Sequence, residues 1–403
     1  MTMRSVSLLA LTLAPLCAAG CGSDSSGTPD PTKDPAKVAA GQQTFRFDTF
    51  GDESLWTDVL QMQTVISTAV DPTTALSVGL KVDATALPAS VVQGIQDGTI
   101  SLTSPATTVA LLKLNAVVGV QGTVTTDASG NDTLTKVGIT CALCHSTVDD
   151  SFSKGIGARL DGYPNRDLNP GAIIALSPAL TAAQKAVYNS WGPGMYDPRY
   201  NLDGMNGPVV IPPAYGLNGI HSDTVTGDGT DLEYWNRYVG ITQMGGHGTF
   251  TEPRTGVSVT NGTDDLISDK LPDLQTYQYS LPAPAPGTFD AAAAARGKMV
   301  FEGQGQCATC HSGPLFTDAN TTLHDPSEVV SEPEPNGEPS YASRSATKKY
   351  RTAPLAGVSQ HPPYFHNATA ATLDDVVAMY NGKKSLGLTA AQSSDLVEYL
   401  KSL

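Results

Sequence analysis

The chain carries the pattern Cys-x-x-Cys-His twice, and this repetition constrains its fold more than any other feature. The two copies are "CALCH", with Cys141, Cys144 and His145, and "CATCH", with Cys307, Cys310 and His311. Six cysteines occur in all, and the four that lie beyond residue 21 all fall in these motifs. With no other cysteines there is no conventional disulfide framework, so the four residues serve another purpose.

Three kinds of site fit such a motif. A redox disulfide of thioredoxin type needs its cysteines at a helix N-terminus within a β-α-β pattern, and no such alternation surrounds Cys307. A zinc site made of four thiolates would leave His145 and His311 without a role. Covalent c-type haem uses every position, because each thiol adds to one vinyl group and the histidine becomes the proximal iron ligand. The sequence therefore favours two covalently bound haems c.

The first 21 residues have the pattern of an export signal. One basic residue, Arg4, is followed by an apolar run that is too short for a spanning helix, and then by small residues. The segment ends in "AAGC", which resembles a bacterial lipobox with Cys21 as the lipidated residue. Cleavage by an ordinary signal peptidase would instead release a soluble product.

Residues 22–39 are polar and rich in Pro and Gly, as expected for a flexible tether. We therefore expect a lipid-anchored protein on the periplasmic side of the cell envelope, touching the membrane through the anchor only. Gly22 after the cysteine favours the outer membrane.

The formal net charge of −15 argues against nucleic acid or anionic lipid as a partner. An acidic surface suits encounters with small basic electron-donor proteins, such as cytochromes or copper proteins. Acidity that serves solubility alone explains the charge equally well.

A Pro- and Ala-rich stretch at residues 282–288 is predicted to link two haem domains, residues 40–281 and 289–403. In the second domain, Asp290 can cap a helix over "AAAAARGKMVFEG". At the C-terminus, Thr389 and Gln392 form a capping box that opens a further helix.

These two helices, with a haem motif between them, resemble a class I cytochrome c domain. In that family the first helix crosses the last, and a glycine, here Gly297, allows their close approach. Phe301 and Tyr399 would be the aromatic residues at the crossing.

The first domain is less regular. A β-hairpin is predicted in "GTVTTDASGNDTLTKVGI", leading into the first motif. No helix of the Arg-Gly…Phe type precedes Cys141, so we expect a divergent haem domain with an added N-terminal region. The predicted fold is mainly α, with two cytochrome c-like haem domains.

A weak internal repeat relates residues 212–239 to residues 353–380. Both segments begin with Pro-x-x-Gly-[Leu/Val], contain a histidine, and then open a helix at a Thr-Leu or Thr-x-Leu sequence. The repeat places His221 loosely opposite His366. It predicts that each haem domain ends in a loop and helix that lie over its haem.

The stretch "YRTAPLAGVSQHPPYFHNATAATLDDVVAMY" resembles a segment of the bacterial di-haem cytochrome c peroxidases and their relatives. Those relatives include the enzymes that mature a tryptophan-derived quinone cofactor and the haem rubber oxygenases. The resemblance implies that one haem relays electrons while the other reacts with peroxide or dioxygen. It leaves open whether a calcium ion sits between the domains.

The resemblance also suggests iron ligands and catalytic groups. For the second haem, the candidates for the sixth ligand are Tyr380, Met379 and His366. The loop after the first motif contains no histidine, so its iron either stays five-coordinate or takes a more distant ligand. The more distant candidates are Met195, Met205, His221, Met244 and His247.

The polar groups expected near the first iron are Arg159, Arg166 and Asp161, alongside His145 as the proximal ligand. Trp191 is the favoured aromatic bridge between the haems, ahead of Trp235. An acidic, Pro-rich stretch after His324 is expected to be a solvated, mobile loop.

These patterns favour a peroxidase-like oxidoreductase in which electrons enter at the haem of His311 and reach peroxide at the haem of His145. A pure electron carrier with two six-coordinate irons is the second hypothesis. A haem oxygenase acting on an organic substrate is the third.

Overall fold

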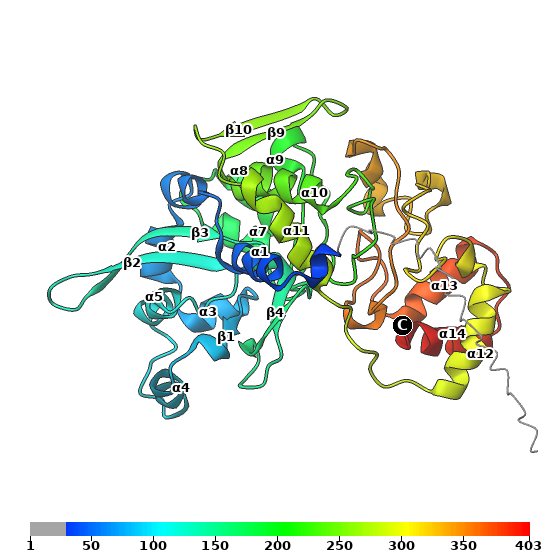
Figure 1. Cartoon of the computed structure of the whole chain (residues 1–403), viewed down its shortest axis with the longest axis horizontal. Helices are drawn as coiled ribbons and strands as arrows, with labels where there is room; N and C mark the ends of the chain where they lie inside the picture. The colour runs from blue at the N-terminus through cyan, green and yellow to red at the C-terminus, as the bar shows by residue number, and fades with distance from the viewer. Residues whose placement is uncertain (1–29) are drawn as a thin grey trace, which may run out of the picture. The chain divides into compact units, whose positions relative to one another are not determined.

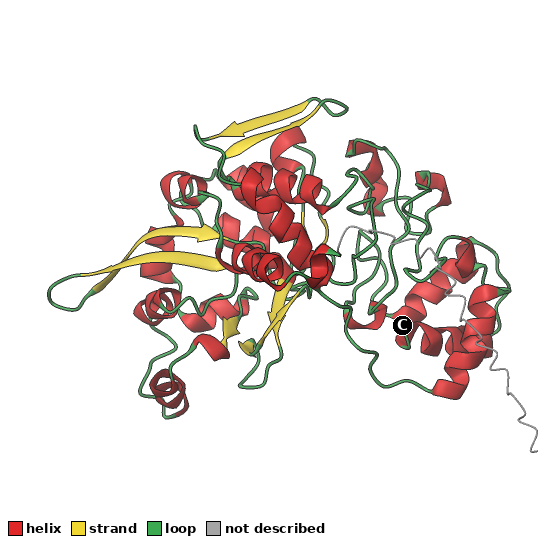
Figure 2. Ribbon diagram, in the orientation of Figure 1, coloured by secondary structure: helices red, strands yellow, loops and turns green. Residues whose placement is uncertain are grey.

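A computed structural model describes residues 30–403 of the chain (Figure 1). The predicted signal peptide, Cys21 and the first part of the tether lie outside the described residues. Within them helices dominate, and the strands pair two by two (Figure 2), so the prediction of a mainly α fold is confirmed. No helix in this range is long and apolar enough to span a bilayer.

The principal helices and strands follow in chain order. The α-helices are α1 (Pro35–Phe47), α2 (Met62–Ala69), α3 (Pro72–Ser77), α4 (Ala89–Gln96), α5 (Pro105–Lys113), α6 (Ala142–His145), α7 (Pro170–Ala175), α8 (Ala182–Asn189), α9 (Tyr200–Asp203), α10 (Leu232–Val239), α11 (Leu271–Ser280), α12 (Ala291–Glu302), α13 (Leu373–Lys383) and α14 (Ala390–Lys401). The strands are β1 (Val82–Asp83), β2 (Val120–Thr126), β3 (Asp132–Ile139), β4 (Ser146–Val148), β5 (Ile156–Gly157), β6 (Arg159–Asp161), β7 (Met195–Tyr196), β8 (Val209–Val210), β9 (Gly248–Glu252) and β10 (Val257–Asn261).

Helices α12 and α14 cross at a glycine, as the sequence predicts (Figure 1). A Cβ atom on Gly297 would lie 1.9 Å from the carbonyl oxygen of Asp395, so only glycine allows this approach. Phe301 and Tyr399 meet edge to face at the crossing, with ring centroids 5.2 Å apart. The predicted roles of these residues are confirmed.

A second crossing of the same kind joins α1 and α11. A Cβ atom on Gly41 would lie 1.9 Å from the carbonyl oxygen of Asp273. Phe45 and Tyr277 meet edge to face, with ring centroids 5.5 Å apart. The expectation that the first half lacks this helix is therefore wrong. The helix lies further upstream, with Ala40 where the second half has Arg296 before the glycine.

The last helices of the two crossings share one sequence pattern. Residues 273–281 read "DLQTYQYSL" and residues 395–403 read "DLVEYLKSL", so Asp-Leu-x-x-Tyr-x-x-Ser-Leu occurs in both. The equivalent tyrosines, Tyr277 and Tyr399, face the equivalent phenylalanines across the two crossings. The pattern in the sequence and the pairing in the structure describe the same duplication.

The loops of the predicted internal repeat also occupy equivalent positions. Gly216 donates its N–H to the carbonyl of Leu281 at 2.9 Å, and Gly357 donates to the carbonyl of Leu403 at 3.0 Å. Both glycines have positive φ, 66° and 69°. The repeat is thus confirmed at the level of backbone hydrogen bonds.

An insertion lies between α1 and the first Cys-x-x-Cys-His motif. It contains α2 to α5 and ends in the antiparallel pair β2–β3, which lies at the residues predicted to form a hairpin. Its apolar side chains, among them Trp56, Leu112 and Val137, pack with Leu143 of the motif in one buried cluster. The hairpin therefore delivers the chain directly into the candidate site.

Candidate haem sites

The first motif forms a short helix whose backbone is held by the loop that follows it. Cys141 precedes α6, and His145 donates its backbone N–H to the carbonyl of Cys141 at 3.2 Å. Gly162 donates to the carbonyl of His145 and Asn165 to the carbonyl of Cys144, each at 2.8 Å. The loop thus holds the backbone that carries the thiol of Cys144 and the imidazole of His145.

The imidazole of His145 has one nitrogen engaged and the other available. Its Nδ1 lies 3.1 Å from the carbonyl oxygen of Pro212. A carbonyl only accepts, so Nδ1 carries the hydrogen and the lone pair of Nε2 is left for a metal. Burial lowers the pKa of His145 to about 4, which keeps the ring neutral as iron ligation requires.

The second motif repeats this arrangement. His311 donates its backbone N–H to the carbonyl of Cys307 at 2.9 Å, and its Nδ1 lies 3.1 Å from the carbonyl oxygen of Phe316. Burial lowers the pKa of His311 as well. In both motifs Nδ1 of the histidine is thus held by a backbone carbonyl, and the backbone of Ala353 also lies close to the imidazole of His311.

The thiols do not have the properties of a redox disulfide or a shared zinc site. Cys141, Cys144, Cys307 and Cys310 are free. Burial raises the pKa of Cys141 and of Cys144 to about 12, whereas a reactive dithiol needs a lowered value. Within residues 30–403, no group of three or more metal-binding side chains joins cysteines of the two motifs.

The surroundings of both motifs fit a large, mostly apolar group. The cysteines and histidines are partly accessible, although burial shifts the pKa values of His145, His311 and three of the thiols. Cys141, Cys144 and Cys307 also pack against the apolar clusters of their halves. When bound there through the thiols, haem would supply an iron that exchanges electrons and binds a small oxidant.

At the second motif, Tyr380 is the predicted ligand that lies beside the cysteines. Its pKa is raised by burial, with smaller contributions from Cys307 and Cys310. Its ring lies 6.1 Å from that of Phe365. Met379 packs against the core of this half. Tyr380 and Met379 thus both lie in the part of this half that contains Cys307.

In the structure, both ring nitrogens of His366 lie within hydrogen-bond distance of other side chains. Its Nε2 lies 2.6 Å from Oε1 of Glu334, and its Nδ1 lies 3.4 Å from Oγ of Ser331. Both partners belong to the acidic, Pro-rich stretch that was expected to be solvated. That expectation is wrong for Glu332 and Glu334, which are 9% exposed.

At the first motif, the position equivalent to Tyr380 is Val239. Asp231 caps α10 fifteen residues after Gly216 (231 − 216), and Thr372 caps α13 fifteen residues after Gly357 (372 − 357). Counting eight further residues gives Val239 in the first half and Tyr380 in the second. Val239 packs against the same apolar cluster as Cys141, and an isopropyl group cannot ligate iron.

The more distant candidates for the first iron are differently placed. His221 is exposed, and Met205 is 41% exposed. Met244 is buried in the apolar core, and its carbonyl accepts a hydrogen bond from the indole of Trp56 at 3.1 Å. His247 and Met195 are partly buried.

The predicted arginine and aspartate residues occupy three separate environments. Arg159 is paired with Asp83 at 3.2 Å, and both side chains are buried. Asp161 accepts from Arg46 at 2.5 Å and from Ser146, the residue after His145, at 2.7 Å. Asp161 therefore contacts the first motif through the residue that follows His145. Arg166 lies near His145, because its charge contributes to the lowered pKa of that histidine.

Trp191 belongs to a cluster of aromatic rings that reaches the first motif. Its ring lies 5.4 Å from that of Tyr196, and its Nε1 donates to Asn206 at 2.8 Å. Tyr196 lies close enough to Cys144 for the thiol to contribute to its raised pKa, after the larger effect of burial. Trp235 instead stacks on Tyr238, with centroids 4.8 Å apart.

Sequence reasoning missed Tyr196, Gln243 and His361. Tyr196 donates to Oε1 of Gln243 at 2.9 Å, and Gln243 comes four residues after Val239. His361 lies against Arg166. The "QHPPYFH" segment identified His366, but no local signal singles out His361, because its partner comes from the other half of the chain.

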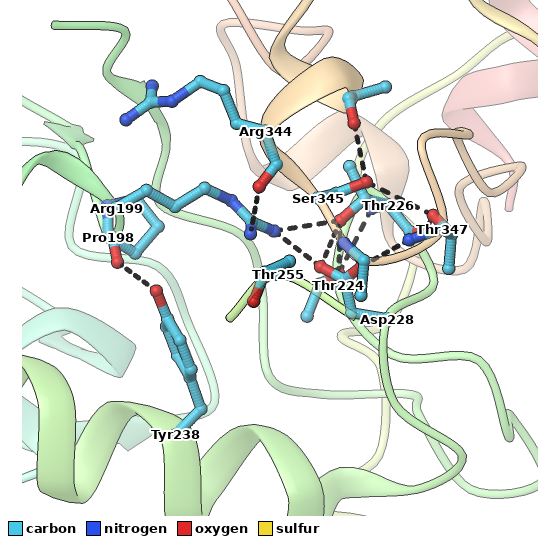
Figure 3. A network of polar contacts seen from close by, with 12 residues as sticks. Pro198, Arg199, Thr224, Thr226, Asp228, Tyr238, Thr255, Arg344, Ser345 and Thr347 are labelled. Carbon is cyan, nitrogen blue, oxygen red and sulfur yellow. Dashed lines mark hydrogen bonds and ion pairs between the residues drawn. The ribbon is translucent and has the colours of Figure 1, made fainter. Parts of the chain in front are cut away.

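A buried polar network also went unpredicted (Figure 3). Arg199 donates to Oδ2 of Asp228 at 2.5 Å and to the backbone carbonyl of Arg344 at 3.0 Å. Asp228 in turn accepts from the backbone N–H of Ala346 at 2.9 Å. The network ties residues 197–228 to residues 341–347, and so connects the halves that carry the two motifs.

Comparison with curated proteins finds relatives among cytochrome c peroxidases. Cytochrome-c peroxidase IdrP1 of Denitromonas iodatirespirans is 33% identical, over 28% of this chain and 40% of its own. Two proteins named cytochrome-c peroxidase IdrP2, from D. iodatirespirans and Pseudomonas sp. (strain SCT), are 30% and 29% identical over 38% and 39% of their lengths. The chain thus spans about 40% of the length of these relatives, and no family model matches it.

Two solved structures show a weak overall likeness. A hydrazine synthase of Kuenenia stuttgartiensis is 21% identical and has a TM-score of 0.37, covering 54% of this chain and 78% of that one. A MauG-like protein associated with microbial copper homeostasis is 19% identical, with a TM-score of 0.34 over 50% and 75%. The predicted resemblance to the cytochrome c peroxidases is confirmed by the curated relatives.

Proposed function

We propose that this chain is a di-haem c-type cytochrome with peroxidase-like activity. Cys307, Cys310 and His311 would hold the haem that receives electrons from a donor, and Cys141, Cys144 and His145 would hold the haem that reacts with the oxidant. There hydrogen peroxide accepts two electrons and two protons and leaves as two molecules of water. The names of the curated relatives support a peroxidase-like oxidoreductase.

The observation that carries this proposal is the difference between Tyr380 and Val239. The two residues occupy equivalent positions in a duplicated fold, yet one offers a phenol oxygen and the other offers no ligand atom. A six-coordinate iron suits electron relay, whereas a five-coordinate iron has a free position that can bind a small oxidant. The difference supports relay at the second haem and substrate chemistry at the first.

The chain also provides polar groups beside the open position. Tyr196 lies near Cys144, and its hydroxyl is held by Gln243, which follows Val239 by one helical turn. The amide of Gln243 is oriented in turn by Asn201, whose Oδ1 lies 3.1 Å from its Nε2. We infer that Gln243 orients the hydroxyl of Tyr196, whose oxygen can then accept a hydrogen bond from peroxide.

The proposal is tested by electron paramagnetic resonance and optical spectra of the oxidised and half-reduced protein. We expect one high-spin ferric signal that shifts when peroxide or cyanide is added. Two low-spin haems whose spectra do not change with peroxide in any redox state would instead indicate an electron carrier. His145→Ala should abolish turnover and leave the haem of His311 reducible, and an active variant would contradict the assignment.

We further propose that the protein is lipid-anchored through Cys21 on the periplasmic side of the envelope, with the outer membrane favoured. Small basic cytochromes or copper proteins are the proposed electron donors, since they complement the net charge of −15. A calcium ion between the halves stays a prediction of the family resemblance. Radiolabelled palmitate incorporation that is lost in Cys21→Ser would test the anchor.

A further inference from the structure

Arg166 and His361 together present buried polar atoms that have no partner in the described part of the chain. The Nε and Nη1 atoms of Arg166 and the Nδ1 atom of His361 are buried without a hydrogen bond. The remaining nitrogen of the guanidinium, Nη2, donates to the carbonyl oxygen of His361 at 2.8 Å. The orphaned atoms therefore belong to two residues in direct contact.

Arg166 also has no counter-charge. Within residues 30–403 it forms no ion pair with a carboxylate, although Arg159, Arg199 and Arg344 each do. The titratable groups that influence its pKa are the phenols of Tyr215 and Tyr364, which are uncharged because burial raises the pKa of each. A guanidinium whose Nε and Nη1 atoms are buried without an anion is costly, because its desolvation is not offset by a charge of opposite sign.

The surroundings of Arg166 place this cation beside the first haem site. Its neighbour Asn165 donates to the carbonyl of Cys144 at 2.8 Å. Tyr215 lies three residues after Pro212, the residue whose carbonyl fixes His145. The charge of Arg166 is felt at the imidazole of His145 and at that of His361.

His361 comes from the half that carries the second motif. Its ring lies 6.4 Å from that of Tyr215 and 5.9 Å from that of Tyr364. Burial lowers its pKa to about 4, so the ring is neutral and one of its nitrogens can donate a hydrogen bond. Arg166 and His361 thus approach the same space from opposite halves of the chain.

We propose that Arg166 and His361 form a binding site for a propionate of the haem held by His145. The inference rests on the proposed function in one respect, namely that haem is attached at Cys141 and Cys144. A propionate supplies the negative charge that Arg166 lacks and the oxygen atoms that the orphaned donors need. Attachment of the first haem would then join residues of both halves through one carboxylate.

Buried water is the alternative partner for these atoms. Water could accept the orphaned hydrogen bonds, since a buried water molecule typically makes about three. It would leave the charge of the guanidinium uncompensated in an environment with phenols but no carboxylate. The missing counter-charge therefore favours an anion over water.

The test compares Arg166→Gln and His361→Gln with Arg296→Gln in the full-length, haem-loaded protein. Arg296 is a suitable control because its side chain is 55% exposed and already pairs with Asp395. Each variant is assayed for covalent haem per chain and for the reduction potential of each haem by spectroscopically monitored titration. Resonance Raman spectra add the propionate bending modes, which respond to lost hydrogen bonds.

We expect Arg166→Gln to lower the potential of the first haem, because a nearby positive charge favours the ferrous state. At a fixed applied potential the ferrous-to-ferric ratio should fall about tenfold, equivalent to about 59 mV for one electron. His361→Gln should change the propionate modes with a smaller effect on potential, and Arg296→Gln should do neither.

Full haem content with unchanged potential and unchanged propionate modes in Arg166→Gln would overturn the inference and indicate water at the orphaned atoms. If that variant fails to fold, the propionate modes are measured in Arg166→Lys, which keeps the charge, and in His361→Gln. Unchanged modes in both variants would then overturn the inference. Wild-type protein without haem at Cys141 would instead refute the proposed function. Two six-coordinate irons would refute the peroxidase activity, but the same variants would still test the propionate site.

Discussion

Phe45 and Tyr277 meet edge to face with their ring centroids 5.5 Å apart, next to a glycine that allows α1 to touch α11. Phe301 and Tyr399 repeat the contact at 5.2 Å beside Gly297. Each pair of helices brackets one Cys-x-x-Cys-His motif. The two halves are therefore variants of one helical frame, and their differences at equivalent positions can be compared directly.

Gly41→Ala and Gly297→Ala should each destabilise the protein. The added Cβ would lie 1.9 Å from the carbonyl oxygen of Asp273 or Asp395, so the helices must separate. Overpacking of this kind costs about 1–3 kcal/mol, and contact with backbone favours the upper end. Urea unfolding followed by circular dichroism measures the change.

Gly382→Ala is the matched control for both variants. Gly382 is also helical, but a Cβ there has nothing within 4 Å. Alanine should be neutral or stabilise by up to about 1 kcal/mol, since it is the better helix former. Equal losses in all three variants would mean that close approach is not what the two crossing glycines provide.

The sequence predicted the second helix crossing and missed the first for a physical reason. In the second half, α12 leads almost directly into its motif, so "RG…F" and "CATCH" are read together. In the first half, the insertion between Phe47 and Cys141 separates the same helix from its motif. Gly41 and Phe45 are still four residues apart, as Gly297 and Phe301 are, but that spacing alone is a weak signal.

The sequence located both motifs but not the groups that surround them. Arg166 was expected near the first iron, yet its contact with His361 joins residues that local patterns cannot relate. His366 was expected as a candidate ligand, and the structure places Glu334 on its Nε2 at 2.6 Å. Such pairings depend on long-range packing, which residue spacing does not encode.

Val239→Tyr should impair peroxide turnover by about tenfold or more, because a phenol would occupy the position that Tyr380 fills in the second half. Val239→Leu is the control, since it keeps an aliphatic side chain of similar size. Steady-state turnover and the optical shift caused by cyanide report the effect. Tyr380→Phe should change the spectrum of the second haem and leave the cyanide response of the first intact.

Equal turnover in Val239→Tyr and Val239→Leu would mean that this position does not face the first iron. The structural equivalence of α10 and α13 would then not extend to iron ligation.

Because of Asp52, the free energy of unfolding should fall as pH rises. The side chain is fully buried below the hairpin. Burial raises its pKa to about 9, with Glu53 and Asp48 adding to the shift and the N–H of Ile139 opposing it. Between pH about 4 and about 9 the unfolded chain has released this proton while the folded chain keeps it. The free energy of unfolding should therefore drop by about 1.4 kcal/mol per pH unit in that window.

Asp52→Asn should remove this contribution, because the amide does not titrate. Urea unfolding at several pH values across the window measures the slope, and the exposed Asp58→Asn provides the control. Parallel slopes for wild type and Asp52→Asn would show that Asp52 is ionised in the folded protein.

Arg199→Met should destabilise the protein by about 3–5 kcal/mol, because it leaves Asp228 buried without its cation. The side chains of this pair are 9% and 4% exposed, and Arg199 also donates to the carbonyl of Arg344. Arg296→Met, which breaks an exposed pair, should cost at most about 1 kcal/mol. Urea unfolding of both variants gives the comparison.

The double variant Arg199→Met/Asp228→Asn separates the buried charge from the rest of the network. Removing the carboxylate charge relieves the uncompensated anion, so the double variant should be more stable than Arg199→Met alone. A double variant that loses the sum of the two single changes would mean that the residues act independently. The contact between residues 197–228 and 341–347 would then be held by packing and backbone hydrogen bonds rather than by the ion pair.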